Sequence, residues 1–125
     1  MPLERPQIEK PAGDIPFELG VDDLVVGEGA EATKGSKVTV HYVGVAFSNG
    51  EEFDASWNRG EPFRFALGKG QVIPGWDQGV AGMRVGGRRK LTIPSALAYG
   101  ARGAGNGVIA PHEPLVFVVD LIAVD

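Results

Sequence analysis

Few side chains in this sequence have the type and spacing that catalytic chemistry needs. The histidines are His41 and His112, and there is no cysteine, so a zinc site would need carboxylates to complete it. No HExxH spacing or GxxxxGK loop occurs, and no serine stands in a Gly-x-Ser-x-Gly elbow. We therefore expect no metal site, no cofactor and no covalent nucleophile. His41 is interpreted as a hydrogen-bonded sheet residue.

A different kind of site is indicated by the segment VIPGWDQGV at 72–80. Pro74 favours the start of a helix, because its fixed φ suits the first turn and its missing N–H would be unpaired there. Trp76, Val80 and Met83 follow at i, i+4 and i+7, so one face of the short helix is apolar. A helix this short is not stable alone in water. A sheet curled over it would form an aromatic-walled pocket with the Trp76 indole as its floor.

Polar candidates stand beside the predicted pocket. Asp54 follows Phe53 on a predicted half-buried strand, where a charge needs a partner, and Arg59 in the following loop is a credible one. Tyr99 begins an aperiodic, glycine-rich segment, residues 99–114. Loops of this length in compact domains are usually functional or mobile. Its glycines favour a flexible loop over a phosphate cradle.

Strands are predicted to supply the wall of this pocket. Alternation or apolar runs typical of strands occur at 38–47, 52–55, 63–67, 89–93 and 115–124. The last is almost continuously apolar and is predicted to be central, with Asp120 inside it. Phe65 is assigned to the core. The fold class is therefore α+β, with an antiparallel five- to six-stranded curved sheet wrapped around one short α-helix.

Residues 1–19 have a different character. Prolines remove backbone donors at regular intervals, at Pro2, Pro6, Pro11 and Pro16, which favours an extended arm. We expect this arm to lie on or near a single domain of residues 20–125, the alternative being a partner-binding segment. A basic cluster of Arg84, Arg88, Arg89 and Lys90 is interpreted as a solvated turn and strand, not as a site for an acidic partner.

Composition excludes several classes of partner. The 125 residues suit one domain, and the net charge of −4 argues against nucleic-acid binding. The N-terminus lacks the basic start and apolar run of a signal peptide. No apolar run approaches the ~20 residues that span a bilayer. We expect a cytoplasmic monomer that binds neither nucleic acid nor membrane.

Eight motifs, in order and with matching spacing, resemble the FKBP family of peptidyl-prolyl isomerases across residues 20–125. They are VTVHYVG at 38–44, EFDAS at 52–56, PFRF at 62–65, VIPGW at 72–76, GVAGMRVG at 79–86, KLTIP at 90–94, AYG at 98–100 and LVF at 115–117. The resemblance implies a sheet wrapped around a short helix. It also implies cis/trans isomerisation of the bond before proline, in a pocket that binds macrolides such as tacrolimus and rapamycin.

The resemblance also assigns residues to the pocket. It implies catalytic positions at Tyr42, Phe53, Asp54, Tyr99 and Phe117. It implies substrate or macrolide contacts at Arg59, Phe63, Val72, Ile73, Trp76 and Ile109. The Ile73 amide and the Tyr99 hydroxyl would donate hydrogen bonds to carbonyls of the ligand, and Tyr42 and Arg59 would orient Asp54. The loop after Tyr99 departs from the family pattern, because it is one residue longer and has no aromatic residue or histidine at its tip.

Two functions from different classes follow. The first is an isomerase that accelerates the folding of proline-containing polypeptides, since X-Pro steps are slow enough to limit folding. The alternative is a non-catalytic binding module that holds a partner through the same pocket. A structural domain without an open pocket would bind no macrolide. The retained aromatic and polar positions favour the isomerase.

Overall fold

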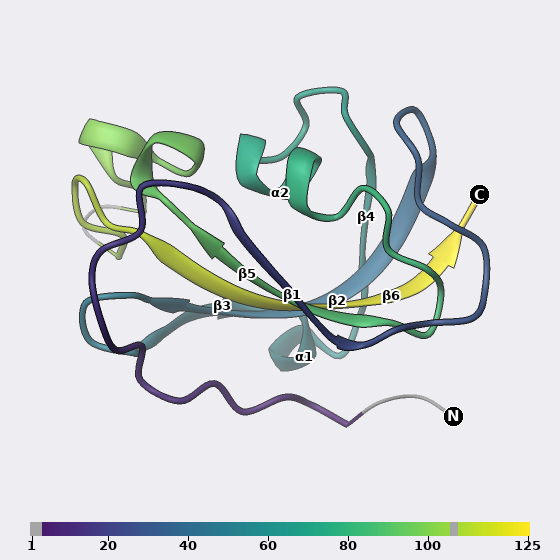
Figure 1. Ribbon diagram of the computed structural model, residues 1–125, viewed down its shortest axis with the longest axis horizontal. Coiled ribbons are helices and arrows are strands. Elements are labelled where there is room, and N and C mark those ends of the chain that lie inside the picture. Colours follow the sequence, from purple (N-terminus) through teal and green to yellow (C-terminus); the bar gives the residue numbers. More distant parts are fainter. Residues whose placement is uncertain (1–3, 106–107) are drawn as a thin grey trace.

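The computed structural model of the chain describes residues 4–105 and 108–125. Its strands form one six-stranded antiparallel sheet in the order β1-β5-β6-β2-β3, with β4 also paired to β2. The strands are β1 (Gly20–Val25), β2 (Lys37–Ala46), β3 (Glu52–Ala55), β4 (Phe63–Ala66), β5 (Arg88–Ile93) and β6 (Leu115–Val124). The sheet is strongly curved (Figure 1). The predicted α+β class is confirmed.

The helix α2 (Pro74–Gly79) lies over one side of the sheet, called the concave face here (Figure 1). A second one-turn helix, α1 (Ser56–Arg59), lies beneath the opposite, convex face and was not predicted. Two 3₁₀ turns, η1 (Ser95–Leu97) and η2 (Gly100–Arg102), cover one end of the concave face. No helix among the described residues is long and apolar enough to cross a membrane.

The main core lies between α2 and the concave face. Trp76 is buried, and so are Val80 and Met83 just beyond the end of α2, as the i, i+4, i+7 pattern predicts. The helix can lie this close to β5 because residue 79 is glycine, where a Cβ would stand 2.6 Å from Cδ2 of Leu91. Strand β6 lies between β5 and β2 and is buried along most of its length, which confirms it as a central strand.

The convex face is also apolar. Strand alternation places Val43, Val45, Val116 and Val118 on this face, and all four are buried. The segment from residue 4 onward runs beneath this face (Figure 1), and its Pro6 is buried and its Ile8 half-buried. The first described part of the predicted arm therefore forms an extended cover over a second apolar layer, and the chain then turns around the end of the sheet (Figure 1).

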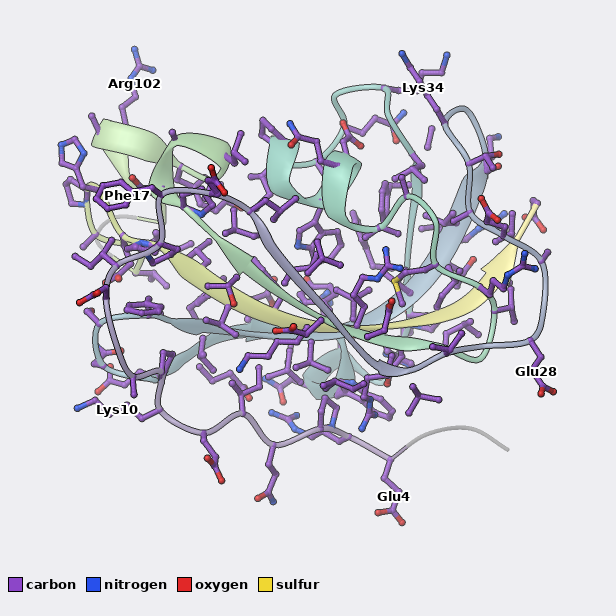
Figure 2. All side chains as sticks on the ribbon, viewed as in Figure 1. Glu4, Lys10, Phe17, Glu28, Lys34 and Arg102 are labelled. Atoms are coloured by element: carbon purple, nitrogen blue, oxygen red, sulfur yellow. The ribbon has the colours of Figure 1, made fainter. Side chains whose placement is uncertain are left out.

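Polar contacts tie this cover to the sheet. Arg5 donates to the side chains of Asn58 and Glu52, and Arg88 donates to the backbone carbonyl of Glu4. Figure 2 shows the Glu4 side chain directed away from the sheet, while its backbone makes that contact. Residues 1–3 lie outside the described residues, and the proposed domain boundary at residue 20 stays a prediction.

The basic cluster differs from its predicted solvated form. Arg88 forms an ion pair with Asp120 at 2.6 Å, and their side chains are only 16% and 4% exposed. These bonds raise the pKa of Arg88. Arg89 pairs with Asp23 and also donates to the carbonyls of Gly79 and Ala81. The solvated interpretation is therefore wrong for Arg88 and Arg89, which join β5 to β6, to β1 and to the end of α2.

Candidate active site

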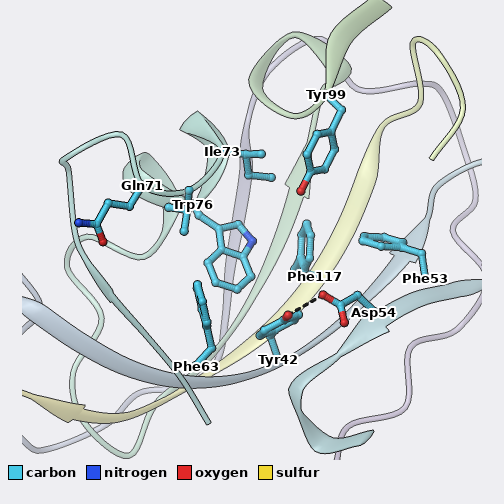
Figure 3. A pocket seen from close by; sticks show the side chains of 10 residues that line it. Tyr42, Phe53, Asp54, Phe63, Gln71, Ile73, Trp76, Tyr99 and Phe117 are labelled. Atoms are coloured by element: carbon cyan, nitrogen blue, oxygen red, sulfur yellow. Dashed lines mark hydrogen bonds between the residues drawn. The ribbon is translucent and has the colours of Figure 1, made fainter. Parts of the chain in front are cut away.

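A cavity of about 210 Å³ lies above the concave face, between α2, β3, β4 and the η1–η2 turns (Figure 3). It is lined by Tyr42, Phe53, Asp54, Phe63, Gln71, Val72, Ile73, Trp76, Tyr99 and Phe117. All the predicted site residues except Arg59 and Ile109 thus line the cavity. The structure adds Gln71, for which the sequence carried no signal.

The apolar part of the cavity is built from aromatic rings in edge-to-face contact. The Trp76 ring lies 4.9 Å from that of Tyr42 and 5.2 Å from that of Phe117, at interplanar angles of 80° and 84°. Phe53 meets Phe117 at 5.4 Å and 87°. Such pairs are favourable beyond the area that they bury. Trp76 is therefore a fixed floor, as the sequence pattern indicates.

The loop between β4 and α2 carries Gln71, Val72 and Ile73 to the rim. It is held by hydrogen bonds from the Gly68 and Gly70 amides to the Asp77 carboxylate, at 2.8 and 3.0 Å. The Gln71 side chain also accepts a hydrogen bond from the Ala66 amide. The loop that carries Val72 and Ile73 is thus held by hydrogen bonds to β4 and to α2.

Three polar side chains form a closed network at one edge of the cavity, called the polar trio here. The Tyr42 hydroxyl donates to Oδ2 of Asp54 at 2.5 Å (Figure 3). Arg59 donates to Oδ1 of Asp54 at 2.8 Å and to the Tyr42 hydroxyl at 2.9 Å. The Asp54–Arg59 pair is about half exposed, so it contributes little to stability. Its effect is to orient the Asp54 carboxylate.

Both tyrosine hydroxyls of the site remain protonated at neutral pH. Burial raises the pKa of Tyr42, and its hydrogen bond to Asp54 raises it further. Burial also raises the pKa of Tyr99, together with the negative charge of Asp54. Hydrogen bonds to Tyr42 and Asp54 raise the pKa of Arg59, which therefore stays cationic. The site consequently holds two neutral hydroxyl donors beside a fixed ion pair.

These shifts predict how stability depends on pH. The pKa of Tyr42 in the folded protein lies above the ordinary value of 10.0, so the folded state disfavours the phenolate. Its contribution to stability is present below about pH 10 and is lost as the pH rises through the folded-state pKa. In urea unfolding from pH 8 to pH 11, Tyr42→Phe should lose less stability than the wild type. Identical losses would contradict the assigned shift.

Ile109 lies in the core instead of lining the cavity. It is 6% exposed and pairs with Ala104 in an isolated bridge, which closes part of the glycine-rich segment. Its predicted ligand contact stays a prediction. The flexible-loop interpretation of 103–107 falls partly on Asn106 and Gly107, which lie outside the described residues.

Gly44 allows two pocket rings to approach β2. A Cβ at this position would stand 2.6 Å from Cε1 of Phe117 and 2.7 Å from Cζ of Phe53. Gly44→Ala is therefore expected to displace both rings and to destabilise the protein by about 1–3 kcal/mol. If the site is catalytic, kcat/KM should also fall by about tenfold. Urea unfolding and enzyme kinetics test this, and unchanged values in both would contradict the geometry.

Fold and site together define a class of small domains in which a curved sheet encloses a short helix and an apolar pocket lies over a buried tryptophan. Residues 28–122 match the family model described as FKBP-type peptidyl-prolyl cis-trans isomerase. The chain therefore belongs to this family. The predicted family and enzyme class are confirmed.

Individual relatives agree with this assignment. An FK506-binding protein of Streptomyces anulatus is 62% identical, with 99% of this chain and 100% of that protein covered. The peptidyl-prolyl cis-trans isomerase FPR2 of Saccharomyces cerevisiae is 57% identical, with 85% and 75% covered. The crystal structure of AtFKBP13 superposes with a TM-score of 0.79 at 46% identity, covering 86% of this chain and 94% of that one.

Proposed function

We propose that the cavity over Trp76 catalyses cis/trans isomerisation of X-Pro bonds in polypeptides by non-covalent stabilisation of the twisted amide. The observation that carries this proposal is a buried indole floor, enclosed by aromatic rings and bordered by hydrogen-bond donors. The proline ring lies against Trp76, between Tyr42 and Phe117. The expected monomeric state stays a prediction.

The lowering of the rotational barrier that the reaction requires is small enough for such a site to provide. Rotation about a peptide bond is opposed by ~18–20 kcal/mol because twisting destroys amide resonance. Turnover at ~100 s⁻¹ corresponds to a barrier of about 15 kcal/mol. The pocket therefore has to supply only about 5 kcal/mol. Interactions that favour the twisted form over the planar one can supply this without a nucleophile.

The apolar walls act on the charge distribution of the amide. A planar amide carries negative charge on oxygen, and a twisted amide has lost much of this charge separation. An apolar cavity therefore disfavours the planar ground state more than the transition state. The Asp54 carboxylate at the edge acts in the same direction, because it repels the more negative oxygen of the planar form.

Donors at the rim hold the neighbouring backbone while the bond rotates. The Tyr99 side chain is 40% exposed, and Figure 3 shows its hydroxyl directed into the cavity. We assign to it, and to the Ile73 amide at the start of α2, hydrogen bonds to carbonyls that flank the rotating bond. Fixing both sides confines the motion to one amide.

The same cavity is proposed to bind tacrolimus and rapamycin, in line with the FK506-binding name of the Streptomyces relative. The binding-module alternative is not favoured, since the yeast relative is named as an isomerase. A protease-coupled assay on an X-Pro peptide, with and without stoichiometric rapamycin, tests the proposal. We expect acceleration that rapamycin abolishes. Rapamycin binding without acceleration would instead support a binding module.

A further inference from the structure

A buried serine lies behind the polar trio, at a gap in the sheet. Strand β2 pairs with β4 up to Val40 and with β3 from Val43 onward. Tyr42 lies between these two stretches, so neither strand pairs with its backbone on that side. Ser56, the first residue of α1, fills the gap and is 0% exposed.

The Ser56 hydroxyl takes the place of the missing strand. The Tyr42 amide donates to Ser56 Oγ at 2.7 Å, and Ser56 Oγ lies 3.4 Å from the Tyr42 carbonyl oxygen, to which it donates. In an antiparallel pair the amide and carbonyl of one residue point to the same side. The polar groups of the Tyr42 backbone are thus directed at Ser56, where leaving them unpaired would be costly.

His41 completes the hydrogen bonding of this serine. Its Nδ1 lies 2.8 Å from Ser56 Oγ, and its ring stacks on Trp57 at 4.3 Å and 20°. A hydroxyl has one proton and two acceptor sites. We assign the Ser56 proton to the Tyr42 carbonyl, an assignment in which the His41 Nδ1 carries a hydrogen and donates it to Ser56 Oγ. Ser56 then makes all three hydrogen bonds available to it.

The same serine connects the members of the polar trio. Ser56 lies two residues after Asp54 and three before Arg59, and its hydroxyl attaches that segment to Tyr42, the third member. We propose that Ser56 is a positioning residue of the isomerase, which sets the Tyr42 hydroxyl against Asp54 and Arg59 through the Tyr42 backbone. This inference rests on the proposed function of the pocket.

A double-mutant cycle separates positioning from a merely structural role. Ser56→Ala should lower kcat/KM for an X-Pro peptide by about tenfold in the wild-type background. It should lower kcat/KM by less than twofold in the Tyr42→Phe background, because there is no hydroxyl left to position. Equal losses in both backgrounds would overturn the proposal. A wild type without isomerase activity would instead contradict the proposed function itself.

Two further variants control for loss of stability. Val118→Ala removes buried volume from the convex face outside the network, and it should lower Tm without changing kcat/KM. Ser56→Cys keeps the size of the side chain but accepts hydrogen bonds weakly, and it should resemble Ser56→Ala in activity. A Val118→Ala variant as inactive as Ser56→Ala, or a fully active Ser56→Cys, would overturn the proposal.

Hydrogen exchange gives a readout that is independent of activity. The Tyr42 amide should exchange slowly in the wild type and about a hundredfold faster in Ser56→Ala, while the Val119 amide on β6 should change much less. In the wild type the His41 Nδ1 should show a directly bonded proton in a ¹⁵N spectrum. Unchanged Tyr42 exchange in Ser56→Ala would contradict the assigned hydrogen bond.

Discussion

Replacing Asp54 with leucine is expected to lower kcat/KM for an X-Pro peptide by about tenfold or more, while the protein remains folded. The substitution removes the acceptor of the Tyr42 hydroxyl and the partner of Arg59, and it removes the negative charge at the cavity edge. The fold should survive, because the Asp54 side chain is 43% exposed. A tenfold loss corresponds to about 1.4 kcal/mol of transition-state stabilisation. Steady-state kinetics and circular dichroism measure the two effects.

Two companion variants refine this test. Asp54→Asn keeps the shape and one acceptor oxygen but not the charge, so its activity should lie between those of the wild type and Asp54→Leu. Phe53→Ala removes a ring that packs on Phe117, and it should also lose about tenfold or more in kcat/KM. Wild-type activity in both Asp54→Leu and Phe53→Ala would refute the assignment of the site.

Removing residues 1–19 is expected to lower the free energy of unfolding by about 2–5 kcal/mol. The deletion uncovers valines on the convex face and removes the Arg5 contacts to α1 and β3. Activity per folded molecule should stay within about twofold of the wild type, because the cavity lies on the concave face. Urea unfolding and kinetics at low temperature measure the two quantities separately.

Phe17 offers a matched control within the same segment. It is 92% exposed, and Figure 2 shows it at the outside of the molecule. Phe17→Ser should change neither stability nor activity. A truncated chain as stable as the wild type would show that the segment is not a cover. A truncated chain that folds fully but has lost its activity would show that the segment supports the site.

The central part of the fold could be predicted because its residues alternate between two buried layers. Strands β2 and β6 carry this pattern along most of their length. Their predicted limits were therefore close to the observed ones, although β2 ends at Ala46 and not at Phe47. Strand β1 was missed because it lies at the edge of the sheet and five of its six residues are exposed. Because Asp22 and Asp23 stand inside this edge strand, its sequence does not show the alternation of apolar and polar residues by which a strand is predicted.

The aromatic part of the site was predictable for a related reason. Trp76 follows a proline at a helix start, and the rings that surround it stand on alternating strands. The polar contacts were harder, because they join segments far apart in sequence. Arg59 could be paired with the nearby Asp54, but no local pattern links Arg88 to Asp120 or Ser56 to Tyr42. The sequence around Gln71 likewise contains no feature that predicts a residue of the cavity lining.

The most direct test of catalysis in this pocket uses the two indoles of the chain. Trp76 lies at the cavity floor and Trp57 beneath the convex face, and each has a buried Nε1 without a hydrogen-bond partner among the described residues. The measurement is an NMR exchange experiment on an X-Pro peptide with a catalytic amount of the protein, followed by peptide titration of the ¹⁵N-labelled protein. We predict cis–trans exchange peaks that require the protein, and a shift of the Trp76 indole signal with little change at Trp57. Exchange peaks without a Trp76 shift, or no exchange at all, would contradict the account.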